Sequence, residues 1–519
     1  MQGLRSLSRS RQTVSQAAFW LTAFTVLNKL LSLAQQVMLG RVYGASADTD
    51  AFAIAQIVPL MIGGLIGGSL TLCLIPIFAD RDRQPPGALS GLALILGAGL
   101  ALLSATFCAS AKPTMGFLGH GLDATTMALT VRLFAPLTSL ILFVGLAGIL
   151  TTSFHTQDRF VVPAAAVNVL YVGGIAGIML RPVLGIDGLA WGLVAGGLAQ
   201  AVILALFMGR DWLHRPAIDV RLAGAVARSF VPVFVGSAIS TLYLVIDRSF
   251  ATSFPTGYVA GFTFAGNLMT IPSQLVVLNL NSALFPSLVR SRTRSDEFSR
   301  LFVSALSWGS FLVLPAVLVL WAWSQPLVKL LFGSNHFGVE AVGLTSRILV
   351  AYTASAVGLA LKDTASNALI ALGSEQIPML VGVASLAFSV LLKVIWLPRS
   401  GYTAIATSTG LASLLNAVVL LALLARRVPV PWQELWHRSL QKLLPCGLGM
   451  LAVVWPLRAR AAAGGPASWV LPIAGGVAYA GLCLLLHVPE ATFLWARVRM
   501  LGQRIGGCMG KRRDGSAGR

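Results

Sequence analysis

Charged side chains inside long apolar stretches are the residues most able to do chemistry in this sequence. Lys29, Asp247, Lys362 and Lys393 each stand within such a stretch, and Asp50 stands at the start of one. A charge at the centre of a bilayer costs roughly 2.5–3.5 kcal/mol, so each one needs a partner, water or a function. The chemistry open to them is ion pairing and the binding of ions or phosphates. The alternatives are snorkelling of a lysine to the membrane interface and capping of a helix by Asp50.

Residue patterns typical of catalysis or metal binding are absent from the sequence. The six histidines are dispersed without metal-ligand spacing, and the five cysteines form no CxxC pair. The glycine-rich segment 63–69 lacks the Lys-Ser/Thr of a nucleotide loop, so close packing of helices by small residues is the better interpretation. We predict no catalytic residue, no metal site, no cofactor and no enzyme activity.

The elements that must position these charges are membrane helices. The chain has 519 residues, of which 56% are hydrophobic and 11% charged, with a mean hydropathy of +0.80. Soluble domains carry about 25% charged residues, so the composition excludes a soluble protein. About fourteen apolar segments are long enough to cross a bilayer as helices. They are 17–39, 51–79, 89–111, 128–154, 160–180, 184–208, 224–252, 258–288, 300–332, 342–372, 377–397, 402–425, 441–457 and 466–488.

The formal net charge of +20 follows the predicted topology. With a cytoplasmic N-terminus, roughly two thirds of the Lys and Arg residues fall in cytoplasmic segments, which is the positive-inside pattern. We therefore predict a multi-pass protein with both termini in the cytoplasm, whose basic segments face membrane lipids and bind no nucleic acid.

An internal repeat divides the predicted helices into two halves. The spacing from Arg132 to Pro163 equals that from Arg347 to Pro378, and both stretches run from arginine through a helix and a polar turn to proline. Parallel repeats with a pseudo-two-fold axis along the membrane normal are typical of transporters. The fold class is thus an all-α polytopic membrane protein with two six-helix lobes and two added C-terminal helices. The predicted regions are a cytoplasmic segment 1–16, an N-lobe 17–208, a linker 209–223, a C-lobe 224–425, a loop 426–440, helices 441–488 and a basic tail 489–519.

Several short motifs, in a particular order, resemble one transporter family. They are Gly40-Arg41-Val42-Tyr43-Gly44, Thr49-Asp50-Ala51-Phe52, Ile75-Pro76-Ile77-Phe78, Phe134-Ala135-Pro136, Arg159-Phe160, Leu268-Met269-Thr270-Ile271-Pro272 and Leu284-Phe285-Pro286-Ser287-Leu288. With them the chain resembles the MurJ/MviN family over nearly its whole length. That family belongs to the multidrug/oligosaccharidyl-lipid/polysaccharide exporter group.

The resemblance implies a flippase in the bacterial inner membrane. Its substrate would be an undecaprenyl-pyrophosphate-linked glycan such as lipid II, moved from the inner to the outer leaflet by alternating access. An exopolysaccharide or O-antigen repeat-unit flippase is the alternative, followed by a cation-coupled multidrug exporter and a scaffold without transport. Cell-wall or exopolysaccharide synthesis proteins are candidate partners.

The chain departs from the family at its cavity. The resemblance implies cavity arginines, which suit a pyrophosphate because guanidinium offers paired donors. Lys29 keeps the charge at its matched position, whereas Gln35, Ile62-Gly63 and Asn267 lose it. The candidate substrate-binding residues are Lys29, Gln35, Asp50, Asn267 and Lys362, with gating contacts as a further role for Asp50.

The resemblance also implies a sodium site that joins the seventh and eleventh helices. Asp247 matches the acid of that site, and Lys393 stands where an amide would serve the ion. A tethered ammonium neutralises a buried carboxylate without capturing an ion from solution. We therefore expect an Asp247–Lys393 pair in place of sodium, with separate contact of each side chain with the outer interface as the alternative.

Overall fold

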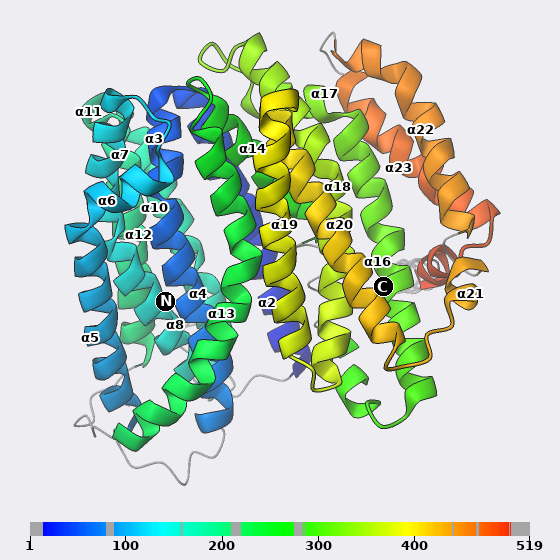
Figure 1. Ribbon diagram of the computed structural model, residues 1–519, viewed down its shortest axis with the longest axis horizontal. Helices are drawn as coiled ribbons and strands as arrows, with labels where there is room; N and C mark the ends of the chain where they lie inside the picture. Colours follow the sequence, from blue (N-terminus) through cyan, green and yellow to red (C-terminus); the bar gives the residue numbers. More distant parts are fainter. Residues whose placement is uncertain are drawn as a thin grey trace, which may run out of the picture. The chain divides into compact units, whose positions relative to one another are not determined.

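The computed structural model describes residues 14–78, 88–155, 157, 159–208, 220–273, 284–285, 287–437, 441–462, 467–497 and 499. Every regular element in these residues is a helix, which is the structure that satisfies backbone groups within a single membrane-crossing segment. The chain divides into two compact units, whose boundary falls within three of the helices. Figure 1 labels the elements of both.

The first unit comprises the described residues up to Phe264 together with Lys329–Thr345. Its helices are α2 (Val14–Tyr43), α3 (Ala47–Ala55), α4 (Ile57–Phe78), α5 (Ala88–Ala109), α6 (Ala111–Leu118), α7 (Ala124–Leu137), α8 (Ser139–His155), α9 (Val161–Ala166), α10 (Asn168–Met179), α11 (Arg181–Leu184), α12 (Asp187–Met208), α13 (Val220–Ala251) and the beginning of α14 (Tyr258–Pro272).

Small residues set the spacing between helices of the first unit. Helix α8 packs against α4, α5 and α12, and α10 packs against α12 (Figure 1). A Cβ atom on Gly148 of α8 would lie only 2.3 Å from the Cα of Gly67 of α4, and one on Gly173 of α10 would lie 2.4 Å from the carbonyl oxygen of Gly192 of α12. In lipid, helices associate through such close packing. The packing role predicted for the glycine-rich segment 63–69 is confirmed.

The second unit comprises Ala265–Val328 and the described residues from Ser346 onward. Its helices are α16 (Ser295–Ala322), α17 (Ser324–Phe332, which ends in the first unit), α18 (Val339–Ala371, which begins there), α19 (Gln376–Ser400), α20 (Thr403–Ala425), α21 (Trp432–Leu435), α22 (Gln441–Ala462) and α23 (Ala467–Leu485). Its core includes Phe302 of α16, Leu369 of α18 and Leu420 of α20, each with no exposed surface.

The described helices are those of a polytopic membrane protein. Nine of them are long and apolar enough to cross a bilayer: Ala47–Leu70, Ser90–Ala109, Ala124–His155, Val161–Met179, Asp187–Met208, Ser295–Ala322, Val339–Ala371, Gln376–Ser400 and Thr403–Ala425. Pro472–Leu485 and Pro489–Arg497 together pass the same test but are bent by 104°. Helices α2, α13 and α22 match the predicted segments 17–39, 224–252 and 441–457 in position. Part of the predicted segment 258–288 lies outside the described residues, so the count of fourteen stays a prediction.

The internal repeat has equivalent local structure in its two copies. The hydroxyl of Thr138 donates to the carbonyl of Ala135 at 2.7 Å, and that of Thr353 donates to Val350 at 2.6 Å. After the helix, the amide of Arg159 bonds the carbonyl of Phe154 and the amide of Ser374 bonds that of Leu369, each at 3.0 Å. These turns are the polar turns of the sequence repeat.

One difference between the copies follows from a single residue. Pro136 lies in the last turn of α7, just before the break at Thr138, and Ala351 takes its place in the second copy, where α18 is continuous. Proline lacks the amide donor that an unbroken helix needs, so it explains the break in the first copy alone. The division into six-helix lobes stays a prediction.

Candidate functional site

Asp50 is a buried carboxylate that holds the beginning of another helix. It lies in α3, is 2% exposed, and accepts bonds from the amides of Gly257 at 2.6 Å and Ala260 at 2.7 Å. Those amides belong to the start of α14, where unpaired donors and the positive end of the helix dipole attract an anion. The sequence favoured capping of Asp50's own helix, but Ser46 takes that place. Asp50 therefore joins α3 to α14.

A second contact joins the end of α2 to the turn after α17. The Arg41 guanidinium donates to the carbonyl oxygens of Leu330 at 2.6 Å and Leu331 at 2.7 Å, where the last turn of α17 leaves acceptors unpaired. Gly44 has a φ of +72°, and a Cβ on it would lie 2.0 Å from the carbonyl oxygen of His336. These contacts explain the Gly-Arg-x-x-Gly pattern of residues 40–44 physically.

Two further candidates lie on α2. Lys29 is partly buried, in a part of α2 whose other side chains are either exposed or partly buried. Gln35 is 7% exposed, and its amide group lies against α10, because a Cβ on Gly174 would come within 2.8 Å of it. Gln35 therefore packs between two helices of its unit.

Lys393 is the most completely buried cation among the described residues. It lies in α19 with no exposed surface, and its ammonium donates to the hydroxyls of Ser389 at 2.6 Å and Thr409 of α20 at 2.9 Å. Snorkelling to the protein surface is thus wrong for this residue. Asp247 of α13, in the first unit, is also fully buried. The predicted Asp247–Lys393 pair stays a prediction.

Lys362 and Asp363 pair with each other on α18. The Lys362 ammonium lies 3.1 Å from the Asp363 carboxylate, with the side chains 12% and 23% exposed. Neighbours on a helix point about 100° apart, but the lysine stem is flexible enough for its ammonium to reach the carboxylate of the next residue. Asn267 of α14 is partly buried, and its main-chain carbonyl oxygen accepts a hydrogen bond from the Thr270 hydroxyl at 2.9 Å.

Arg41 is a residue to which the sequence analysis gave no role. It was quoted only as part of the motif of residues 40–44. The sequence feature that could have indicated its role is the pair of glycines on either side of it. A Cβ atom on Gly40 would collide with Phe332, and one on Gly44 would collide with His336. Among the described residues, no three His, Cys, Asp or Glu side chains gather as a metal site would need.

Comparison with known sequences extends the resemblance to nearly the full chain. The family model "Lipid II flippase MurJ" matches residues 39–474. A probable lipid II flippase MurJ of Bdellovibrio bacteriovorus is 27% identical over 464 residues, covering 86% of this chain and 88% of the relative. The lipid II flippase MurJ of Burkholderia cenocepacia is 26% identical over 455 residues, covering 83% and 88%.

Comparison with solved structures shows the same fold. Lipid II flippase MurJ in an inward closed conformation superposes with a TM-score of 0.78 at 18% identity, covering 91% of this chain and 99% of that one. An inward-facing multidrug transporter of the MATE family gives 0.65 at 14% identity, covering 77% and 94%. At these identities the structures show the fold, while the family model spans most of the sequence. The chain belongs to the lipid II flippase MurJ family, a family of transporters and not of enzymes.

Proposed function

We propose that this protein moves lipid II from the inner to the outer leaflet of the bacterial inner membrane. The observation that carries the proposal is the match of the family model to residues 39–474, which span both compact units. A charged, sugar-bearing headgroup cannot cross hydrocarbon unaided, because each unsatisfied polar group costs several kcal/mol there. Alternating access between repeats provides a polar route.

Lys29 is proposed to bind the pyrophosphate of the substrate. It is partly buried in α2, a helix of 30 residues, and an ammonium binds phosphate oxygens as a compact charge. Gln35 and Asn267 are each proposed as a neutral substrate-binding residue, which contributes hydrogen bonds in place of charge. This division of roles makes Lys29 the residue whose loss should affect transport most.

Asp50 and Arg41 are proposed to hold the outer gate. Both bind backbone groups at helix ends, and both join segments far apart in the sequence, with separations of 207 residues for Gly257 and 290 for Leu331. Contacts of this kind break as a unit when helix ends separate. Opening toward the outer side would therefore require Asp50 to release the first turn of α14.

The test of function is complementation of a bacterium depleted of its own lipid II flippase. We expect the wild-type chain to restore growth, Lys29→Ala to abolish rescue at an unchanged protein level, and Lys29→Arg to restore part of it. Lys112→Ala is the control, because Lys112 is an exposed lysine of α6. Failure of the wild-type chain at normal expression would contradict the proposed substrate. Normal rescue by Lys29→Ala would contradict only the role of Lys29.

A further inference from the structure

A cavity of about 530 Å³ lies in the second unit, between α16, α21 and the helix Pro489–Arg497. One face of α16 forms its wall, since Arg300, Ser304, Ser307 and Trp308 recur at helical spacing. The stripe from Arg300 to Ser307 runs roughly 10 Å along the helix axis. The cavity is therefore long enough for a ligand with two separated polar groups.

A buried carboxylate lies at one end of the cavity. Glu490 is 6% exposed and accepts a bond from the Ser307 hydroxyl at 2.5 Å. A carboxylate accepts up to about four hydrogen bonds, so this bond leaves acceptor capacity for a donor in the cavity. Trp308 and Phe493 line the same cavity with ring centroids 5.9 Å apart. A carboxylate beside aromatic rings is a favourable environment for an ammonium group.

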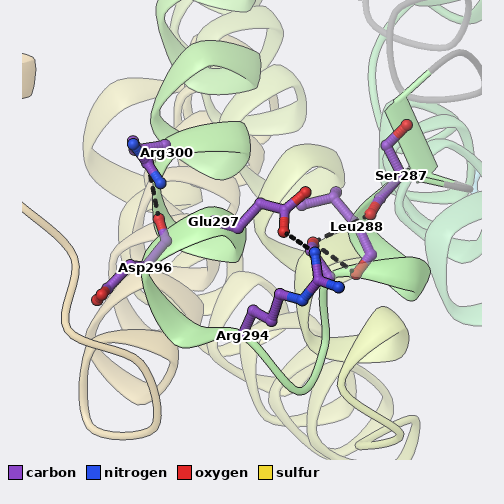
Figure 2. Close-up of polar contacts among 7 residues, drawn as sticks. Ser287, Leu288, Arg294, Asp296, Glu297 and Arg300 are labelled. Atoms are coloured by element: carbon purple, nitrogen blue, oxygen red, sulfur yellow. Dashed lines mark hydrogen bonds and ion pairs between the residues drawn. The ribbon is translucent and has the colours of Figure 1, made fainter.

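The other end of the α16 stripe carries a guanidinium. Arg300 donates from Nε to the carbonyl oxygen of Asp296 at 3.3 Å, and Arg294 pairs with Glu297 (Figure 2). Because that bond uses Nε, the two terminal amino groups of Arg300 offer paired donors, which suit a phosphate. Glu434 of α21 adds a second carboxylate to the lining. The cavity thus presents charges of both signs.

Two features near this cavity favour a position at the level of lipid headgroups. The helix Pro489–Arg497 is bent by 104° from the end of α23, as expected for a segment that leaves the membrane and follows its surface. Trp432, Trp436 and Trp495 are 39%, 47% and 57% exposed around it. Exposed tryptophans are typical of the interface between hydrocarbon and water.

We propose that this cavity binds the headgroup of a phospholipid with a primary ammonium, of the phosphoethanolamine class. Glu490 accepts hydrogen bonds from the ammonium, and Arg300 binds the phosphate. A purely anionic headgroup would fit Arg300 but has no ammonium to place beside Glu490. A quaternary ammonium has no N–H group to donate to Glu490. A zwitterion with a primary amine matches both ends of the cavity.

The experiment measures lipid binding to the purified full-length chain by native mass spectrometry. Palmitoyl-oleoyl phosphatidylethanolamine, phosphatidylcholine and phosphatidylglycerol are titrated separately into detergent-solubilised protein. We expect the ethanolamine lipid to bind about tenfold more tightly than the other two, since a hydrogen bond to a charged group is worth about that factor. Soluble glycerophosphoethanolamine should compete with it.

Variants assign the binding to this cavity. Glu490→Gln keeps an acceptor for Ser307 but loses the charge, and should remove the preference for the ethanolamine lipid. Arg300→Ala should weaken binding of the ethanolamine and glycerol lipids alike. Glu297→Gln is the matched control on α16, because Glu297 pairs with Arg294 outside the cavity lining and should change nothing. Equal binding of ethanolamine and choline lipids, or an unchanged preference in folded Glu490→Gln, would overturn the proposal. The readout is independent of lipid II transport.

Discussion

Asp50 shows how one side chain can join helix ends that are distant in the sequence. Its two oxygens each accept one amide, and both amides stand at the start of α14. A carboxylate in this position compensates the helix dipole and satisfies donors that the helix itself leaves unpaired. The energetic weight of the contact is large because the carboxylate is buried, where a donor left unmatched is costly.

We expect Asp50→Asn to destabilise the protein by about 1.5–3 kcal/mol, since its amide can accept at one oxygen only and turns an NH₂ group toward the other donor. The measurement is the midpoint of thermal unfolding of the purified protein. Asp48→Asn is the control, because Asp48 is exposed on the same helix. An unchanged midpoint of thermal unfolding would show that the two hydrogen bonds of Asp50 contribute little to the stability of the protein.

The proposed gate gives a second expectation for the same variant. In Asp50→Asn, a cysteine introduced at the exposed position Ser253 should react faster with a thiol reagent added from the outer side.

Lys393 should make transport independent of sodium. Its ammonium binds the hydroxyl oxygens of Ser389 and Thr409. Oxygen atoms are also the ligands that a hard cation such as sodium would need. We expect equal transport by the wild-type chain in sodium and sodium-free buffer, and loss of transport in Lys393→Met. Arg399→Gln, at an exposed position of α19, should transport normally. Strict sodium dependence of the wild-type chain would contradict this prediction.

The predicted pairing with Asp247 has its own test. Asp247→Lys and Lys393→Asp should each reduce transport, and the double variant should recover part of it, because the swap restores opposite charges. Single variants that transport normally would show that the two residues do not depend on one another.

At the scale of elements, the packing of helices depends on glycines at particular registers. The backbones of α4 and α8 touch at Gly67 and Gly148, whereas a Cβ atom on Gly64 or Gly68 of α4 would have no described atom within 4 Å. We expect Gly148→Leu to prevent accumulation of folded protein, because its side chain would displace the α4 backbone. Gly68→Leu is the matched control and should accumulate normally. The amount of monodisperse protein after purification measures both.

The sequence predicted these elements unequally well. Apolar length and the repeat from Arg132 to Pro163 predicted helices and turns that the structure contains, because both depend on local backbone chemistry. Helix α6 (Ala111–Leu118) lies mostly between the predicted segments 89–111 and 128–154, where no helix was predicted. The partners of Asp50 and Lys393 could not be predicted, since a single sequence contains no record of which distant helix ends meet. Lys362 and Asp363 were adjacent in the sequence, but their pairing depends on side-chain flexibility.

At the scale of the whole molecule, the topology is the prediction to test first. Reporter fusions after Arg292 and after Leu118 should give a cytoplasmic and an extracytoplasmic signal respectively. The reason is the excess of Lys and Arg in the segments predicted to be cytoplasmic, which sets membrane orientation. Fusion at the C-terminus should report the cytoplasm as well. An extracytoplasmic signal after Arg292 would overturn the predicted orientation.

The Lys362–Asp363 pair on α18 has an electrical consequence. Moving one elementary charge across a membrane potential of 100 mV involves about 2.3 kcal/mol of work. Because the two charges of this pair are adjacent and opposite, a displacement of α18 carries them through the field together with no net work. The voltage can then act on the transport cycle through isolated intramembrane charges and through the charge of the cargo. The Lys362–Asp363 pair itself therefore adds no voltage dependence to a movement of α18.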